Sequence, residues 1–331
     1  GLYAKKNENK TEIIYFTRNG YVVKNGELSS FILPKTYSPH NSKGGIRGVF
    51  FNNNIPYALM ASKKIACDYA AIINLKTSKE IFSTECLPDT SKINYDGVGG
   101  ASIHLPNKIL LTIGTPSNNS EFIRSLAQNK DSFFGKIIEI DKKNLSDFEN
   151  NKIKKIDIEI YSSGHRNPQG MARIDNRIYS SEHGPKGGDE INFIIKNKNY
   201  GWPKSSYGTK YFIEPSADYN KGEQLTKYYE NSHTKYGFEE PLLQFTPSIG
   251  ISSLTNCPKK LIEFYERKNC LLANSLREKS LYIVILDEIN GKRIIGYEKI
   301  NLDKRLRNFA LNLDGTLYEE GGTVANRFTG E

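Results

Sequence analysis

Short runs of apolar residues recur along almost the whole chain, and clusters of Asn, Gly, Asp and Lys separate them. Runs of about four to seven residues between turn-forming residues are typical of β-strands rather than of helices. Clear examples are Glu12–Phe16, Gly48–Phe51, Ile109–Gly114, Lys136–Ile140, Ile191–Ile195 and Leu281–Leu286. The pattern therefore predicts an all-β chain.

The number of these runs narrows the fold further. About twenty of them follow one another without a linker, which is too many for one ordinary sandwich. Small antiparallel sheets repeated around an axis accommodate that many strands and leave only short edges exposed. We therefore expect residues 1–331 to form one β-propeller domain, with short helices only at Ser120–Asn129 and Pro258–Glu266.

Composition excludes several classes of protein. A chain of 331 residues with 37% hydrophobic and 25% charged residues is globular, not collagen-like or disordered. No window resembles a membrane helix, and the missing initiator Met and signal core favour a mature or trimmed chain. The net charge of +9 is spread over Lys- and Asn-rich loops, so we expect a solvated surface and no nucleic-acid binding.

Four cysteines fall into two local pairs, Cys67 with Cys86 and Cys257 with Cys270. Neither pair has the Cys-x-x-Cys spacing of a zinc or redox site, and an even number of local pairs favours two disulfides. Disulfides would indicate an oxidising compartment. The alternative is a cytosolic protein with four buried free thiols.

Residues 161–203 are unusually polar and Gly-rich, as expected of loops that carry a site on a rigid scaffold. Arg166, Asn167 and Gln169 offer a guanidinium and two amides, which suit an anionic or carbonyl-rich planar ligand. The segments 183–185 and 187–190 place backbone carbonyls beside carboxylates, the oxygen ligands that Ca²⁺ prefers. Alternatively, Asp189 and Glu190 cap turns, and His165 binds its own loop.

Four ordered motifs in this segment carry a specific resemblance: Gly164-His-Arg-Asn-Pro-Gln-Gly170, Ser181-Glu-His-Gly-Pro185, Gly188-Asp-Glu-Ile-Asn192 and Asn199-Tyr-Gly-Trp-Pro203. Together they resemble the signature of the soluble quinoprotein sugar dehydrogenases, also called glucose/sorbosone or aldose sugar dehydrogenases. The resemblance covers residues 96–331 well, 45–95 faintly and 1–44 hardly at all. It implies a six-bladed β-propeller that uses pyrroloquinoline quinone (PQQ) and Ca²⁺.

The resemblance also implies a set of binding residues. Those expected to contact PQQ are Arg166, Asn167, Gln169, His183, Gly184, Pro185, Arg277, Arg305 and Arg307. Those expected to hold Ca²⁺ are the carbonyls of Gly184 and Pro185 and, for a second structural ion, Glu190 and the main chain of Tyr200. The prediction for Arg305 and Arg307 does not depend on the resemblance alone, because two Arg side chains two positions apart on a strand project to the same side and can bind one anion together. Trp202 is expected to anchor its loop by packing.

One departure from the family concerns the general base. The family's His, which precedes a Gly-Gly pair by two residues, is replaced by Gly97, and its following Arg is replaced by Ala101. The Asp that supports the base is replaced by Thr115. Asp96 is the candidate catalytic residue that remains, although a carboxylate there also suits a turn. Tyr95, His165 and His183 are weaker substitutes.

Three functional hypotheses follow. The first is an exported, periplasmic or secreted PQQ- and Ca²⁺-dependent dehydrogenase that oxidises an aldose or another alcohol and passes electrons to an external acceptor. The second is a non-catalytic propeller that retains a pocket for a quinone, a sugar or a protein. The third is a structural propeller without a cofactor, in which the basic residues converge on nothing; a lactonase-type enzyme rests on fold analogy alone.

Overall fold

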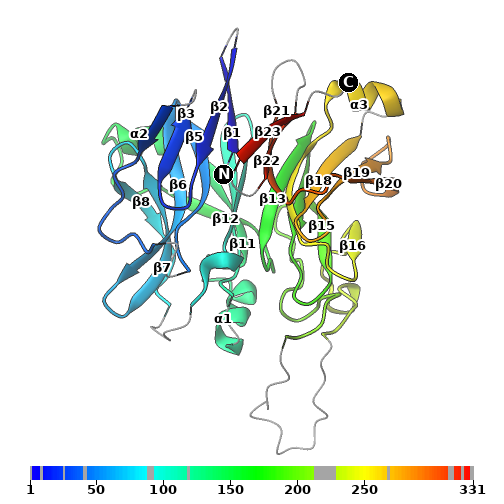
Figure 1. Cartoon of the computed structure of the whole chain (residues 1–331). Coiled ribbons are helices and arrows are strands. Elements are labelled where there is room, and N and C mark those ends of the chain that lie inside the picture. Colours follow the sequence, from blue (N-terminus) through cyan, green and yellow to red (C-terminus); the bar gives the residue numbers. More distant parts are fainter. Residues whose placement is uncertain are drawn as a thin grey trace, which may run out of the picture.

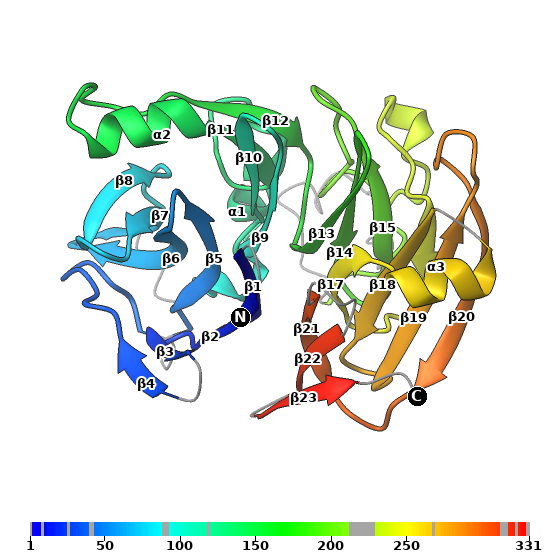
Figure 2. The same ribbon diagram turned by 90° about the horizontal axis from the view of Figure 1, so that it is seen from above.

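The chain folds as an all-β propeller, in which small antiparallel sheets are arranged in a ring (Figures 1 and 2). The structure is a computed structural model and describes residues 2–7, 10–24, 27–39, 43–87, 93–117, 120–211, 229–266, 269–311, 317–321 and 324–328. The prediction of an all-β propeller is confirmed. Each of the six apolar runs named above coincides with a strand, although Gly114 and Ile195 each lie one residue past the strand's end.

The first three sheets come from the N-terminal half of the chain. The first contains β1 (Leu2–Asn7), β2 (Lys10–Phe16), β3 (Tyr21–Lys24) and β4 (Glu27–Ser30). The second contains β5 (Ile46–Asn52), β6 (Ile55–Lys64), β7 (Cys67–Asn74) and β8 (Lys79–Ser83). The third contains β9 (Gly99–His104), β10 (Lys108–Ile113), β11 (Lys136–Asp141) and β12 (Ile158–Ser163).

The other three sheets follow in chain order. The fourth contains β13 (Pro168–Ile174), β14 (Arg177–Glu182), β15 (Asp189–Ile194) and β16 (Leu243–Phe245). The fifth contains β17 (Ile251–Asn256), β18 (Cys270–Ser275), β19 (Ser280–Leu286) and β20 (Ile294–Asn301). The sixth contains β21 (Leu306–Leu311), β22 (Leu317–Gly321) and β23 (Val324–Phe328).

The number of complete blades differs from the six predicted. In the described part of the chain five sheets have four strands, whereas the last has three. The number six came from the family resemblance, because the irregular spacing of the apolar runs does not show how many strands each sheet receives. The first strands of the sheets lie next to one another: β9 contacts β5 and β13, β17 contacts β13 and β21, and β1 contacts β21.

The cores lie between neighbouring sheets, which explains why the strands are short and apolar. One cluster, including Phe50, Leu111 and Ile138, fills the space between the second and third sheets. Another, including Tyr179 and Leu271, fills the space between the fourth and fifth. Strand β7 is buried at every position, because both of its faces are covered, whereas the outer strand β20 is largely exposed.

Helices are few and short, as predicted. Residues 120–129 contain α1 (Glu121–Ser125) and the 3-10 turn η3 (Leu126–Gln128), and α3 (Lys259–Tyr265) follows Pro258. The helix α2 (Lys142–Glu149) was not predicted. Its sequence is mostly polar, yet Asp141 caps it by accepting a hydrogen bond from the backbone N of Asn144 (2.8 Å), and Leu145 and Phe148 are buried.

Both predicted disulfides form. Cys67 is bonded to Cys86, with Cα atoms 5.0 Å apart, and Cys257 to Cys270, with Cα atoms 5.3 Å apart. The alternative of four free thiols is therefore wrong. In the ranges given above, no helix combines the length and apolar character that crossing a membrane requires.

Candidate functional site

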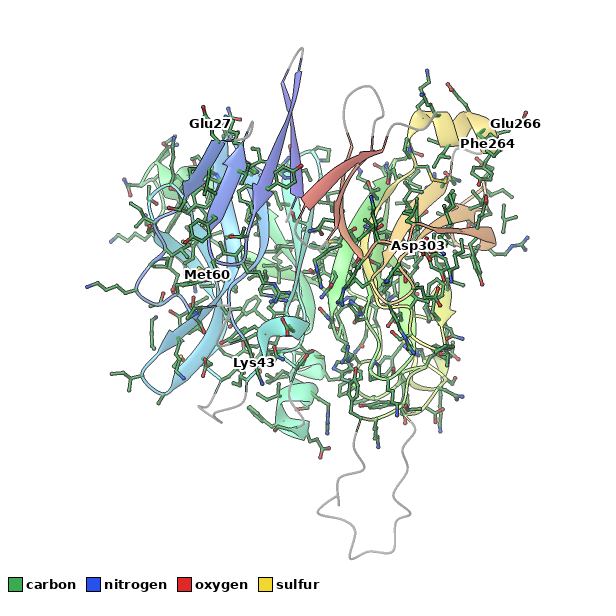
Figure 3. All side chains as sticks on the ribbon, viewed as in Figure 1. Glu27, Lys43, Met60, Phe264, Glu266 and Asp303 are labelled. Carbon is green, nitrogen blue, oxygen red and sulfur yellow. A yellow bond between two sulfur atoms is a disulfide. The ribbon has the colours of Figure 1, made fainter. Side chains whose placement is uncertain are left out.

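The predicted site residues gather where the first strands of several sheets begin. Asp96 lies in the 3-10 turn η2 (Tyr95–Gly97) just before β9, Arg166 just before β13, and Arg305 just before β21. Lys43, labelled in Figure 3, lies toward the end of the ring that carries α1, and its carbonyl accepts a hydrogen bond from the backbone N of Tyr95 (3.1 Å). Phe264 and Glu266, at α3, mark the opposite end.

A cavity of about 430 Å³ opens among these strand ends, within the range of small-molecule sites. Its lining comes from five sheets and the loops between their strands. The lining residues are Arg18, Asp96, Ser117, Arg166, Asn167, Gln169, His183, Gly184, Pro185, Tyr211, Ser248, Leu276, Arg305 and Arg307. Eight of the nine residues predicted to contact a cofactor are among them, so residues far apart in sequence converge on one place.

A buried carboxylate organises the loop that carries Arg166. Glu182, at the end of β14, accepts hydrogen bonds from the backbone N of Arg166 and of Asn167, the latter at 3.2 Å. It also contacts Nδ1 of His165 (3.0 Å), whose Nε2 lies 2.9 Å from Ser162 Oγ. His165 is fully buried and does not line the cavity, so it binds its own loop, as the alternative interpretation expected.

Hydrogen bonds connect the polar side chains along this side of the cavity. The guanidinium of Arg166 donates to the His183 carbonyl (2.9 Å) and lies over the Trp202 ring, 5.2 Å from its centroid. Gln169 donates to Asn167 Oδ1 (3.3 Å), while its own Oε1 accepts from Arg307 (3.2 Å). Trp202 is buried and does not line the cavity, in agreement with a packing role.

The three Arg residues predicted from the C-terminal part of the chain differ in whether they line the cavity. Arg305 and Arg307 both line the cavity, as their two-residue spacing predicted. Arg277 is exposed and does not line it; its guanidinium donates to the Ser248 carbonyl (3.1 Å) at the edge. The convergence of Arg166, Arg305 and Arg307 opposes the hypothesis of a propeller whose basic residues meet nowhere.

His183 faces the cavity as a neutral side chain. Its Nδ1 lies 3.9 Å from Asp189 Oδ1, and one fifth of the side chain is exposed (19%). Burial lowers its pKa, and the partly compensating carboxylate of Asp189 does not reverse that effect, so the imidazole is uncharged near neutral pH. His183 can therefore accept or donate a single hydrogen bond to a ligand without adding charge.

Asp96 is held by two guanidinium groups. Its Oδ1 accepts hydrogen bonds from Arg18 (2.8 Å) and from Arg47 (3.3 Å), and half of its side chain is exposed (51%). Partial burial alone would raise the pKa of Asp96, but Arg47 and Arg18 outweigh it and hold the pKa below its usual value. Burial and the nearby Arg18 lower the pKa of Arg47 to about 10, so Arg47 keeps its charge.

The backbone fills the place where a side chain at residue 97 would lie. A Cβ atom on Gly97 would overlap the carbonyl oxygen of Thr115, because η2 lies flat against residues 114–117. Thr115 is buried and donates from Oγ1 to the His165 carbonyl (2.9 Å), so it supports the loop. Tyr95 is buried, with its hydroxyl on the Ser62 carbonyl (3.3 Å), and does not line the cavity.

Oxygen atoms suited to Ca²⁺ are present but few. Gly184 and Pro185 line the cavity, and the Pro185 carbonyl accepts a hydrogen bond from Tyr211 (3.0 Å). In the described ranges no group of three or more His, Cys, Asp or Glu side chains is placed to hold a metal ion. An ion at these carbonyls would therefore take its remaining ligands from a bound organic anion or from water.

Glu190 and Tyr200 border a second, very small cavity of about 10 Å³, the size of one water molecule. Glu190 is buried and accepts from Asn192 (3.1 Å), and its Oε1 lies 3.8 Å from His233. Burial, followed by the nearby Glu182, raises its pKa well above the usual range. The Trp202 Nε1 and the Ser205 Oγ atoms there lack hydrogen-bond partners within the structure. The structure thus places Glu190 and Tyr200, the two residues predicted to hold a second ion, at the same small cavity.

Sequence reasoning missed Arg18 and Arg47. Both precede or flank the region of good resemblance, and neither belongs to a recognisable motif. Arg18 lies in the turn between β2 and β3, 78 residues from Asp96, and Arg47 lies in β5, 49 residues from Asp96. Only the three-dimensional arrangement of the sheets reveals the contact.

Comparison with known proteins gives a consistent result. The model of the family described as Glucose / Sorbosone dehydrogenase matches residues 43–321. Aldose sugar dehydrogenase YliI of Escherichia coli is 32% identical over 227 residues, which cover 66% of this chain and 56% of that protein. The chain spans less than two thirds of the length of the first curated relatives that it matches.

Solved structures show the same fold. The apo-form of a soluble aldose sugar dehydrogenase from E. coli superimposes with a TM-score of 0.71 at 22% identity, covering 98% of this chain and 93% of that one. The PQQ-bound form of an aldose sugar dehydrogenase from Streptomyces coelicolor gives a TM-score of 0.62 at 19% identity, covering 96% and 86%. At these identities the likeness concerns the fold.

Proposed function

Because the chain belongs to the glucose/sorbosone dehydrogenase family, we propose that it is a PQQ- and Ca²⁺-dependent dehydrogenase of an aldose or another alcohol. The E. coli relative, an aldose sugar dehydrogenase, supports the reaction class, and the PQQ-bound Streptomyces structure supports the cofactor. The prediction of this family from four motifs is confirmed.

One observation carries the proposal: the cavity lining is rich in fixed cations. Four of its fourteen described lining residues are Arg, and Asp96 is the one carboxylate among them. PQQ is a planar tricycle with three carboxylates, so a site for it needs several cations and planar hydrogen-bonding groups. The charge and the amides of this cavity fit that requirement.

Arg305 and Arg307 would pair with carboxylates of PQQ, because both lie in the cavity. Arg166, Asn167 and Gln169 would line its edge, and the uncharged imidazole of His183 would form one hydrogen bond to it. The exposed Arg277 contributes at most from outside the cavity. When bound, PQQ supplies a two-electron acceptor, while the protein supplies position and charge.

Calcium would be held by the carbonyls of Gly184 and Pro185. Two carbonyls alone bind Ca²⁺ weakly, so binding of the ion and of the anionic cofactor should each strengthen the other. Glu190 and the main chain of Tyr200 would hold a second, structural ion in the small cavity behind this loop. That ion would favour the ionised form of Glu190, which burial disfavours.

Asp96 is the proposed acceptor of the substrate hydroxyl proton. Its carboxylate is ionised at neutral pH and reaches the cavity, both of which a proton acceptor needs. The lowered pKa makes it a weak base, because Arg18 and Arg47 stabilise the charged form. Residue 97 is Gly, and a Cβ there would overlap the Thr115 carbonyl, so this position supplies no imidazole base.

The number of blades, the cellular location and the electron acceptor are part of the same proposal. We take β21–β23 as the sixth blade of a single domain spanning residues 1–331, because β21 contacts both β17 and β1. The two disulfides favour export to the periplasm or secretion. An external acceptor would then reoxidise the cofactor.

The test is a calorimetric titration of metal-stripped protein with PQQ, with and without Ca²⁺. Tight binding that requires Ca²⁺, followed by bleaching of the bound quinone when an aldose is added, is the expected result. Absence of binding at high micromolar PQQ would contradict the proposal. The control variant Arg293→Ala removes one positive charge at an exposed turn between β19 and β20, and it should bind PQQ like the wild type.

A second candidate is a non-catalytic propeller that uses the same cavity for binding. The replacements at Gly97 and Thr115 favour it, because they remove the family's base and its partner together. It predicts tight PQQ or sugar binding without quinone bleaching, so the same titration separates the two candidates.

A further inference from the structure

Gln128 joins the third sheet to the fourth. It lies in η3, between β10 and β11, and its side chain reaches the loop between β15 and β16. Its Nε2 donates hydrogen bonds to Asn199 Oδ1 (3.1 Å) and to the Trp202 carbonyl (2.6 Å), and its Oε1 accepts from Asn199 Nδ2 (2.9 Å). Both polar atoms of the amide are therefore engaged, although Gln128 does not line the large cavity.

A buried ammonium group holds the turn that carries Gln128. Lys136 is almost fully buried (1% exposed), and its Nζ donates to three backbone carbonyls, among them those of Leu126 and Ala127, both at 2.9 Å. The Ala127 carbonyl also accepts from the backbone N of Gly164 (3.1 Å). Gln128 thus extends from a fixed backbone, and replacing its side chain leaves all of these hydrogen bonds in place.

Trp202 connects Gln128 to the cavity. Its indole ring is buried, and the guanidinium of Arg166 lies over it, 5.2 Å from the ring centroid. The backbone of Trp202 is held at both polar atoms, because its N donates to the Gly164 carbonyl (3.0 Å) and its carbonyl accepts from Gln128. An indole face attracts a cation, so the place of this ring influences where the Arg166 guanidinium lies.

The orientation of Arg166 matters as well as its charge. Its guanidinium lines the cavity and also donates to the His183 carbonyl (2.9 Å). A guanidinium binds a carboxylate through planar donors in a fixed geometry. If the Trp202 ring moved, the positive charge would stay at the cavity while these donors became misaligned. Gln128 can therefore affect anion binding without touching the anion.

We propose that Gln128 is a positioning residue for the cofactor. By fixing Asn199 and the Trp202 carbonyl it holds the indole ring in place, and the ring orients Arg166 toward a bound carboxylate. The inference rests on the proposed function in that the bound anion is PQQ. It assigns a role in cofactor binding to a side chain outside the cavity.

A double-mutant cycle tests the route through Arg166. Calorimetry in the presence of Ca²⁺ gives the PQQ affinity of wild type, Gln128→Met, Arg166→Met and the double variant. Met keeps the length of the Gln side chain but not its hydrogen bonds. We expect Gln128→Met to weaken PQQ binding about threefold to tenfold, the range of one lost hydrogen bond, and to have no further effect once Arg166 is replaced. A merely structural change would weaken binding equally in both backgrounds, so additive losses would overturn the proposal.

Tryptophan fluorescence provides a second measurement that needs no cofactor. Trp202 is the only Trp in the chain, so its emission reports on this ring alone. Acrylamide should quench the buried indole weakly in wild type, and Gln128→Met should raise the quenching constant. Gln244→Met, at an exposed glutamine of β16 outside the cavity, is the matched control and should change neither the quenching nor the PQQ affinity. Equal quenching in wild type and Gln128→Met would contradict the proposal.

These measurements separate the role of Gln128 from the proposed function. A wild-type protein that does not bind PQQ would contradict the proposed function, while quenching of the unloaded protein would still decide whether Gln128 holds the ring. Tight PQQ binding that Gln128→Met leaves unchanged would overturn the role of Gln128 alone. If Gln128→Met does not fold, Trp202→Leu takes its place in the cycle, because it removes the ring under Arg166 and keeps the carbonyl that Gln128 binds. Additive losses with Arg166→Met would again overturn the proposal.

Discussion

The two sides of the cavity are formed by residues from different parts of the chain. One side, here called the cofactor wall, consists of Arg166, Asn167, Gln169 and residues 183–185, together with Arg305 and Arg307. The other, here called the substrate wall, consists of Arg18 and Asp96, and the buried Arg47 supports Asp96 from outside the cavity. On the cofactor wall Arg166 bonds to His183, 17 residues away, and Arg307 bonds to Gln169, 138 residues away, whereas on the substrate wall Arg18 and Asp96 are 78 residues apart.

The two walls differ in what holds them in place. On the cofactor wall a buried carboxylate, Glu182, fixes the loop that carries Arg166. On the substrate wall the carbonyl of Thr115 fills the space that a side chain at residue 97 would need. If the proposed function holds, the cavity binds its cofactor through one wall and must obtain its proton acceptor from Asp96 on the other.

The largest expected effect is on the substrate wall. Asp96→Asn should lower kcat by about 10² to 10⁴, the usual contribution of a general base, and leave PQQ affinity unchanged. Because the pKa of Asp96 lies below its usual value of about 3.9, activity should stay level from pH 8 to pH 5 and fall only as pH approaches that pKa. A half-loss near pH 6.5 that survives the substitution would instead indicate an imidazole base.

Placing a His at residue 97, where the resemblance expects the family's base, should damage this wall. Gly97→His should destabilise the fold by about 2 to 4 kcal/mol, because its Cβ would overlap the Thr115 carbonyl and the backbone would have to move. Gly296→His, in β20, is the matched control, since no atom lies within 4 Å of a Cβ there. Thermal unfolding of both variants measures the difference; equal melting temperatures would mean that the 97 site does accept a side chain.

On the cofactor wall, Arg305→Ala or Arg307→Ala should weaken PQQ binding by about 1.5 to 3 kcal/mol, as expected for a lost charge-assisted pair. Arg277→Ala should have a smaller effect, because Arg277 lies outside the cavity. Calorimetry with PQQ gives all three values. Unchanged affinity in both Arg305→Ala and Arg307→Ala would remove them from the site.

The smallest effect concerns the structural Ca²⁺ proposed behind the cofactor wall. A tenfold excess of Ca²⁺ over its dissociation constant should stabilise the fold by about 1.4 kcal/mol. Glu190→Gln should abolish this gain while preserving the hydrogen bond to Asn192. Calcium titration followed by thermal unfolding provides the test, and an equal gain in both proteins would assign the ion to another place.

The same contrast explains what the sequence could predict. The cofactor wall was predictable because most of its residues lie in motifs within about forty positions, and Arg305 and Arg307 follow from strand periodicity. Arg18 and Arg47 were not, since their role depends on how the first and second sheets approach η2. Arg277 illustrates the converse: a residue can match a motif and still lie outside the cavity.

Elsewhere in the fold, local sequence features decided which elements could be predicted. Apolar runs predicted the strands, because burial between neighbouring sheets requires them. Helix α2 escaped prediction because only Leu145 and Phe148 of its eight residues are buried, which leaves a sequence that reads as a polar loop. The number of blades depended on assigning strands to sheets, and the spacing of the runs does not carry that information.

The contact between β1 and β21 has a consequence for the order of assembly. It joins Leu2–Asn7 to Leu306–Leu311, so this contact forms only when both of these distant segments are present. Each blade between them is local in sequence, whereas this seam requires closure of a very long loop. Arg18 lies on one side of the seam and Arg305 and Arg307 on the other. The cavity is therefore complete only once this seam has closed, because Arg305 and Arg307 supply two of the four arginines among its described lining residues.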